Sequence, residues 1–194
     1  MIKKTAIAFA TSILLGAGAS LTALPAVAAD APVKAEQVKS LPNIAILATG
    51  GTIASRGSGS LSLTDYGVGS GHKPVGIEVL SDAVPEIKNF ANITGEQIFN
   101  VGSSKLSVAN ELTLAKRINE FLAKKDVDGI VVTHGTDTLE ETAYFLNLVV
   151  KSDKPVVLVG SMRPATGLSA DGPLNLVNAV ALAASPRAEG KGGM

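Results

Sequence analysis

Residues 43–52, NIAILATGGT, decide the fold, because an apolar run here ends abruptly in two glycines flanked by threonines. The run up to Ala48 has no helical spacing and is short, which is typical of a strand buried on both faces of a parallel sheet. The glycines that follow mark a tight turn. We therefore expect a central strand whose carboxyl end presents Thr49 and Thr52 on a glycine turn.

The same alternation of apolar runs and helical segments continues downstream. We expect further strands at residues 92–101, 128–133 and 156–160, and helices at residues 76–83, 107–124, 139–150 and 173–184. Such repeated strand–helix units are typical of helices packed around a parallel sheet. The sequence therefore predicts an α/β fold with a doubly wound, mostly parallel sheet.

Side-chain patterns give three more detailed expectations. The helix at residues 107–124 is predicted to bury one face, made of apolar residues at spacings of three and four: Val108, Leu112, Ala115, Ile118 and Leu122. Thr138 and Glu141 have the spacing of a capping box at the start of the next helix. Asp171, just before Pro173, is placed to cap the last helix. Residues 55–73, rich in glycine and serine, are expected to form a loop that carries Tyr66.

Composition narrows the classes of function. The 194-residue chain is 46% hydrophobic and 18% charged, as expected for one globular domain with short appendages. Lys plus Arg and Asp plus Glu both number 17, so no overall field attracts nucleic acid or an anionic membrane. The chain has no cysteine, which excludes disulfides, thiol nucleophiles and thiolate zinc sites.

The first 28 residues have the three-part pattern of a secretory signal peptide. Lys3 and Lys4 precede a mainly apolar run over residues 6–15, and small residues lead to an Ala-Val-Ala sequence at residues 26–28. A membrane anchor is the alternative, but this run is shorter than the ~20 residues that span a bilayer. We expect cleavage after Ala28 or Ala29 and a periplasmic protein without membrane contact. Residues 29–41 would form a polar lead-in, residues 42–186 the α/β domain, and residues 187–194 an irregular, truncated tail.

The glycine turn at residues 49–52 is suited to stabilising an oxyanion, because glycine allows free backbone amides to point at one atom. A phosphate-binding loop is the competing interpretation, but the chain contains neither G-x-G-x-x-G nor G-x-x-x-x-G-K-[ST]. A purely structural turn also remains open. The absence of G-x-S-x-G disfavours an ordinary serine hydrolase.

A second loop, residues 133–137 (THGTD), follows another apolar strand and offers a hydroxyl and a carboxylate that can position a polar substrate or a water. Two other readings compete. Asp137 and Thr138 can simply cap a helix, and His134, Asp137 and Glu141 form a weak metal-site pattern. We expect no metal and no organic cofactor. Ligands of such sheets bind outside the carboxyl ends of the strands, so both loops are expected to share one crevice with residues 102–104.

Taken together, residues 47–55 (LATGGTIAS) and residues 129–145 (GIVVTHGTDTLEETAYF) resemble the bacterial L-asparaginase and glutaminase-asparaginase family, in particular its secreted type. The resemblance extends from about residue 41 to residue 184. It implies the N-terminal domain of the asparaginase fold. It also implies a deamidase that acts on free L-asparagine, with some capacity for L-glutamine.

The resemblance also implies roles for individual residues. Thr52 matches the primary nucleophile, and Tyr66 matches the partner that helps to activate and cover it. Thr136 and Asp137 match the second threonine and the aspartate that holds the substrate's α-amino group. Four residues are the candidate substrate-binding group, with Ser103 matched to the serine that binds the α-carboxylate: Ser103, Ser104, Gly51 and Gly135.

Two departures from the family pattern lead to further expectations. Ser104 stands where the family usually has Gln or Glu, so we expect altered affinity and amide preference. The family also has a catalytic lysine and a C-terminal domain beyond the point that matches Met194, and its members assemble as homotetramers. We therefore expect this length, without the C-terminal domain, to have little or no activity. A secreted amino-acid-binding protein that does not turn its ligand over is the alternative.

Overall fold

In a computed structural model, residues 40–67 and 71–194 are described. The predicted signal peptide, its cleavage site and most of the polar lead-in lie outside these residues. Within them, no helix is long and apolar enough to cross a membrane.

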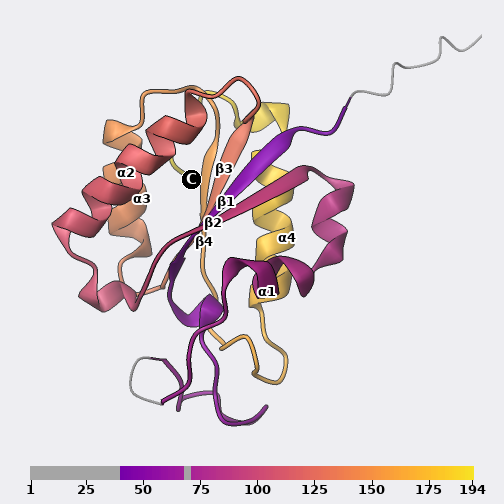
Figure 1. The fold of residues 1–194 in the computed structure, drawn as a ribbon, viewed down its shortest axis with the longest axis vertical. Helices are drawn as coiled ribbons and strands as arrows, with labels where there is room; N and C mark the ends of the chain where they lie inside the picture. The colour runs from indigo at the N-terminus through magenta and orange to yellow at the C-terminus, as the bar shows by residue number, and fades with distance from the viewer. Residues whose placement is uncertain (1–39, 68–70) are drawn as a thin grey trace, which may run out of the picture. The chain divides into compact units, whose positions relative to one another are not determined.

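A four-stranded parallel sheet forms the centre of the domain (Figure 1). Its strands lie in the order β2-β1-β3-β4, with bounds β1 Asn43–Gly50, β2 Asn92–Val101, β3 Gly129–Thr133 and β4 Val156–Val159. Ala48 pairs with Thr133 and Gly50 with Val101, so the carboxyl ends of β1, β2 and β3 meet at one edge. The predicted α/β fold with a parallel sheet is confirmed.

Helices cover both faces of this sheet (Figure 1). The helices α2 (Val108–Leu122) and α3 (Leu139–Val149) lie over one face, and α1 (Ile77–Asp82) and α4 (Gly172–Ala183) lie over the other. Four short 3-10 helices complete the described chain: η1 Thr52–Ala54, η2 Pro85–Asn89, η3 Ser103–Lys105 and η4 Pro186–Ala188.

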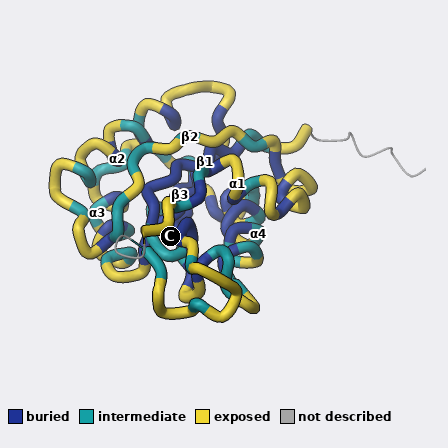
Figure 2. The backbone as a smooth tube through the Cα atoms, turned by 60° about the horizontal axis from the view of Figure 1, so that its bottom comes forward, coloured by how far each residue is buried: buried dark blue, intermediate teal, exposed yellow. Residues whose placement is uncertain are grey.

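The central strand β1 contributes side chains to both cores, as its uninterrupted apolar sequence predicts. Ile44 and Ile46 pack in the cluster that includes Leu176 of α4. Ala45 and Leu47 pack in the cluster of α2 and α3. Figure 2 shows this buried strand in dark blue at the middle of the domain. Strand β1 therefore fixes the position of the turn that follows it.

The buried face of α2 differs from the predicted one at its start. Val108 and Leu112 are 69% and 57% exposed, so both predictions are wrong. The helix instead buries residues of its later turns: Leu114, Ala115, Ile118, Phe121 and Leu122. Spacing identifies the direction of an apolar face, but it does not tell at which turn the neighbouring elements stop covering it.

The predicted capping box at α3 is also wrong. The Thr138 side chain makes no capping bond, and its hydroxyl donates instead to the Ser103 carbonyl at 3.3 Å. A capping box does occur at α2, where Ser107 and Asn110 bond reciprocally. A tertiary acceptor near the start of α3 has thus replaced the local bond.

Asp171 precedes α4 as predicted, but its side chain does not cap the helix. Its two carboxylate oxygens accept hydrogen bonds from the backbone amides of Met162 and Arg163, each at 2.9 Å. These two bonds help to lower the pKa of Asp171 against the opposing effect of burial. The carboxylate therefore stabilises the loop after β4, and it contacts α4 through the side-chain amide of Asn175 at 3.1 Å rather than through a backbone cap.

The last residues, which we expected to be irregular, pair with the sheet. Gly193 forms a parallel bridge with Val156. The Met194 amide donates to the Val156 carbonyl at 2.9 Å, and the Leu158 amide donates to the Met194 carbonyl at 2.6 Å. The residues after α4 thus return to the sheet alongside β4.

Candidate active site

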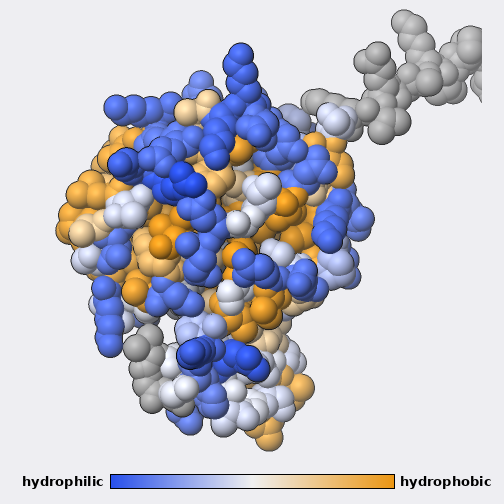
Figure 3. Space-filling view, viewed as in Figure 1, coloured by the Kyte–Doolittle hydropathy of each residue, from blue (hydrophilic) through white to orange (hydrophobic). Residues whose placement is uncertain are grey.

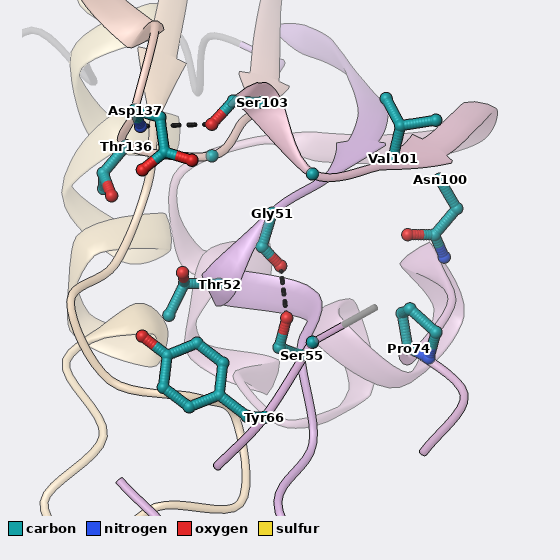
Figure 4. Close-up of a pocket in the computed structure, with 13 residues that line it drawn as sticks. Gly51, Thr52, Ser55, Tyr66, Pro74, Asn100, Val101, Ser103, Thr136 and Asp137 are labelled. Atoms are coloured by element: carbon teal, nitrogen blue, oxygen red, sulfur yellow. Dashed lines mark hydrogen bonds between the residues drawn. The ribbon is translucent and has the colours of Figure 1, made fainter. Parts of the chain in front are cut away.

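A pocket of about 100 Å³ lies where β1, β2 and β3 end (Figure 4). Backbone and side chains from four segments line it: Gly51, Thr52, Ser55, Tyr66, Gly67, Pro74, Asn100, Val101, Gly102, Ser103, Gly135, Thr136 and Asp137. All the candidate residues from the sequence are in this set except Ser104. Ser104 is exposed and does not line the pocket.

The turn after β1 is stabilised by its own neighbours. Gly51 has a φ of 84°, a conformation that strongly favours glycine. Its carbonyl accepts hydrogen bonds from the Ser55 hydroxyl at 2.9 Å and from the Ala54 amide at 3.1 Å. Because the two polar groups of a trans peptide point in opposite directions, these bonds turn the Thr52 amide away from η1. The Thr52 N–H therefore points away from the hydrogen bonds that close the turn.

Tyr66 reaches the same pocket from the loop that follows η1. Its backbone forms an isolated antiparallel bridge with Gly57. In Figure 4 the Tyr66 hydroxyl is the end of the ring nearest to Thr52. Both hydroxyls lie on the side of the pocket where Thr136 is found, so the two loops present their hydroxyl groups to one space (Figure 4).

The turns after β1 and β3 touch backbone to backbone. A Cβ atom on Gly51 would overlap the Cα atom of Gly135, and a Cβ atom on Gly135 would overlap the Ser103 hydroxyl. Glycine at both positions therefore allows the close approach of the turns. This approach places Thr52 and Thr136 in the same pocket.

Ser103, which is buried, joins the turn after β2 to the turn after β3. Its Oγ accepts a hydrogen bond from the Asp137 amide at 3.1 Å, and its carbonyl accepts one from the Thr138 hydroxyl. A serine hydroxyl that accepts one bond still has its own proton to donate. Ser103 can therefore fix the second loop and still donate a hydrogen bond to a ligand.

Thr136 and Asp137 are exposed at the mouth of the pocket. Figure 4 shows the Asp137 carboxylate directed into the space between Ser103 and Thr52. A carboxylate beside a hydroxyl donor is an arrangement that suits a ligand with one cationic and one anionic group. The pocket thus combines the hydroxyls of Thr52 and Tyr66 with the Asp137 carboxylate and the Ser103 hydroxyl.

His134 is completely buried behind this loop and was considered only as a metal ligand at the sequence level. Its Nδ1 lies 2.7 Å from the Gly135 carbonyl oxygen and its Nε2 lies 3.1 Å from the Thr142 hydroxyl. Both ring nitrogens are therefore engaged by the protein. In the part of the chain that the structure describes, no group of three or more His, Asp or Glu residues could hold a metal ion.

Five lining residues were not predicted from the sequence: Ser55, Gly67, Pro74, Asn100 and Val101. Ser55 had a local signal, since it is three residues after Thr52 and belongs to the quoted motif. Pro74 and Asn100 had none, because they reach the pocket through the path of the loop and the last residues of β2.

Comparisons with known proteins identify the family of this chain. The family model for the N-terminal domain of asparaginase matches residues 43–194. The chain is 64% identical to L-asparaginase 2 of Bacillus subtilis over 158 residues, which are 81% of this chain and 41% of that protein. It is 53% identical to the glutaminase-asparaginase of Pseudomonas fluorescens biotype A over 177 residues, 91% of this chain and 47% of that protein.

A solved structure gives the same result. The fold superposes on a crystal structure of a probable cytoplasmic L-asparaginase from Campylobacter jejuni with a TM-score of 0.73 and 54% identity, over 79% of this chain and 45% of that one. The chain thus spans less than half the length of each of these relatives. The matched motifs, the sheet and the family model all lead to one conclusion: this chain belongs to the asparaginase family, of which it carries the N-terminal domain.

Proposed function

We propose that this chain supplies the nucleophile and the substrate-binding loops of an L-asparagine amidohydrolase with some capacity for L-glutamine. The observation that supports the proposal most is the shared pocket of Thr52, Tyr66, Thr136 and Asp137. The relatives named above are an L-asparaginase and a glutaminase-asparaginase. We assign the activities named for these relatives to the residues of this pocket.

The proposed reaction has two steps. The Thr52 hydroxyl attacks the side-chain amide carbon of the substrate, and its proton passes by way of Tyr66 to the leaving nitrogen. The tetrahedral oxyanion is stabilised by backbone N–H groups at the glycine turn, and its collapse breaks the C–N bond and releases ammonia. Water then attacks the acyl-threonine ester, which yields L-aspartate and restores the Thr52 hydroxyl.

Substrate recognition follows from the polar rim. The Asp137 carboxylate pairs with the α-ammonium group, and the Ser103 hydroxyl donates to the α-carboxylate. The backbone at Gly51 and Gly135 forms the floor between them. Ser104 lies outside the pocket lining, so the proposal gives it no direct contact with the substrate.

Acylation of Thr52 is the decisive test. The chain is incubated with L-asparagine and hydroxylamine, and both ammonia and aspartyl hydroxamate are measured, because hydroxylamine traps an acyl-threonine even when hydrolysis is slow. Thr52→Val should abolish the hydroxamate. Thr64→Val, an exposed threonine of the neighbouring loop, is the matched control and should leave it unchanged.

The alternative, a protein that binds amino acids without turnover, predicts a different result. Calorimetric titration would then show L-asparagine binding that survives Thr52→Val, with no hydroxamate from any variant. That combination would replace the proposed reaction with a binding function.

We also propose export to the periplasm; a homotetramer is what the family resemblance implies for the full-length protein, and we expect none for this length. The Campylobacter relative is named a probable cytoplasmic enzyme, so the export proposal depends on residues 1–28 of this chain alone. Cell fractionation with mass measurement of the mature N-terminus tests the export. A product in the cytoplasm that retains residue 1 or 2 would contradict it. Sedimentation of the purified chain tests the assembly, and a tetramer would contradict this expectation.

A further inference from the structure

We infer that His134 is a positioning residue, whose buried ring fixes the peptide between Gly135 and Thr136 so that the Thr136 amide proton faces the pocket. The inference rests on the proposed function and concerns a group that the reaction above does not use. His134 does not line the pocket, and its ring reaches the loop through the Gly135 carbonyl.

The hydrogen bonds of His134 determine its tautomer. A carbonyl oxygen only accepts, so the Nδ1 atom at 2.7 Å from the Gly135 oxygen must carry a proton. The Nε2 atom of the neutral ring then accepts from the Thr142 hydroxyl at 3.1 Å. Burial lowers the pKa of His134, which favours this neutral form. The ring is thus a fixed donor toward one carbonyl.

The direction of the Gly135 carbonyl sets the direction of the next amide. The carbonyl points toward a ring that is wholly buried beneath the loop. In a planar trans peptide the Thr136 N–H points the opposite way, toward the pocket that Thr136 lines. A backbone N–H held in this direction is a donor for the substrate or for the oxyanion formed on it.

The loop needs such a support because its own side chains do not supply one. Gly135 has no side chain, and Thr136 is exposed. The contacts that reach this loop from other elements are the backbone of Gly51, the Ser103 hydroxyl, and Gly160, where an added Cβ would lie 3.0 Å from the His134 carbonyl oxygen. These contacts limit translation of the loop, whereas the hydrogen bond to His134 sets the rotation of the peptide.

The first experiment is independent of turnover. In the ¹⁵N-labelled chain, imidazole nitrogen shifts should report the Nδ1–H tautomer of His134, and Thr142→Val should shift the Nε2 resonance, since its hydrogen-bond donor is lost, while the Nδ1–H tautomer is kept. Thr113→Val is the matched control, because this helical hydroxyl donates only to Ala109 of its own helix. A pure Nε2–H tautomer in the parent chain would overturn the inference.

The second experiment compares variants at position 134. His134→Asn keeps an N–H donor close to the position of Nδ1, whereas His134→Leu removes it. We expect the Thr136 amide resonance to move and hydroxamate trapping to slow about tenfold in His134→Leu, with recovery to within about threefold of the parent in His134→Asn, as expected for loss of orientation rather than of a reacting group.

Two outcomes separate a structural role from a positioning role. An unchanged Thr136 amide in a folded His134→Leu chain would overturn the inference. If His134→Leu does not fold, the tautomer and the Thr142→Val comparison still decide it. No hydroxamate from the parent chain, together with the Nδ1–H tautomer and a Thr136 amide that responds to Thr142→Val, would contradict the proposed function and leave the positioning of the peptide intact.

Discussion

The turns after β1 and β3 meet in one pocket, but they are stabilised in different ways. The turn after β1 closes on itself, because Ser55 and Ala54 both donate to the carbonyl of Gly51. The turn after β3 depends on other elements. Ser103, just after β2, accepts from the Asp137 amide, and Thr142 of α3 bonds the His134 ring. The turn after β1 is thus a local structure, whereas the turn after β3 requires the assembled fold.

Placing a side chain between the two turns should have the largest effect on the free energy of unfolding. Gly51→Ala forces a side chain into a φ of 84° and into the backbone of Gly135. Together these effects should lower the free energy of unfolding by about 3 kcal/mol. Urea denaturation measures the change. Gly59→Ala is the matched control, because a Cβ there meets nothing within 4 Å, and it should stay within about 1 kcal/mol of the parent. An equal loss in both variants would show that the contact is not tight.

Removing the tertiary support of the β3 turn should have the next largest effect. Ser103→Ala leaves the Asp137 amide without its acceptor, and we expect a loss of about 1–2 kcal/mol in the free energy of unfolding. Ser58→Ala removes an exposed hydroxyl pair with Ser62 and serves as the control. Faster hydrogen exchange at the Asp137 amide should accompany the loss, and an unchanged exchange rate would mean that Ser103 does not hold this turn.

The local support of the β1 turn should matter less. Ser55→Ala removes one of two donors to the Gly51 carbonyl, and the Ala54 amide remains. We expect a loss of about 0.5–1 kcal/mol in chemical denaturation, with Thr52→Val near the parent value. A loss larger than that of Ser103→Ala would reverse the comparison between the two turns.

The smallest of these effects should be that of pH near neutrality. It should arise from His134, which belongs to the turn after β3. Burial lowers the pKa of folded His134 below the ordinary value of 6.5, so the unfolded chain binds more protons at low pH. The contribution of His134 to stability is therefore fully present above pH 6.5, falls as the pH drops through 6.5, and levels off below the folded pKa. Denaturation of the parent and of His134→Asn between pH 5 and pH 8 measures it. Parallel stability curves for the two proteins would contradict this assignment.

The strands and the meeting of the loops were predictable because both follow from short-range patterns and one topological rule. Apolar runs marked each strand, and parallel strands bring their carboxyl ends to one edge. The roles of Thr138 and Asp171 were not predictable, since the acceptor and donor groups that engage their side chains come from elsewhere in the fold. His134 was visible as a residue at a strand end, but its partner Thr142 was not, because nothing in the spacing distinguishes an acceptor bond from a metal ligand.

The central position of β1 has a consequence for motion. Strand β1 is hydrogen-bonded to β2 on one side and to β3 on the other, and Ile46 and Leu47 are wholly buried, so its amides should exchange with solvent only when the whole domain unfolds. The neighbouring loop is different, since Leu61 is 79% exposed and the loop is held by single hydrogen bonds to residues 166 and 168 and by the bridge between Gly57 and Tyr66. Amides of this loop should therefore exchange by local opening, whereas those of β1 report on global unfolding.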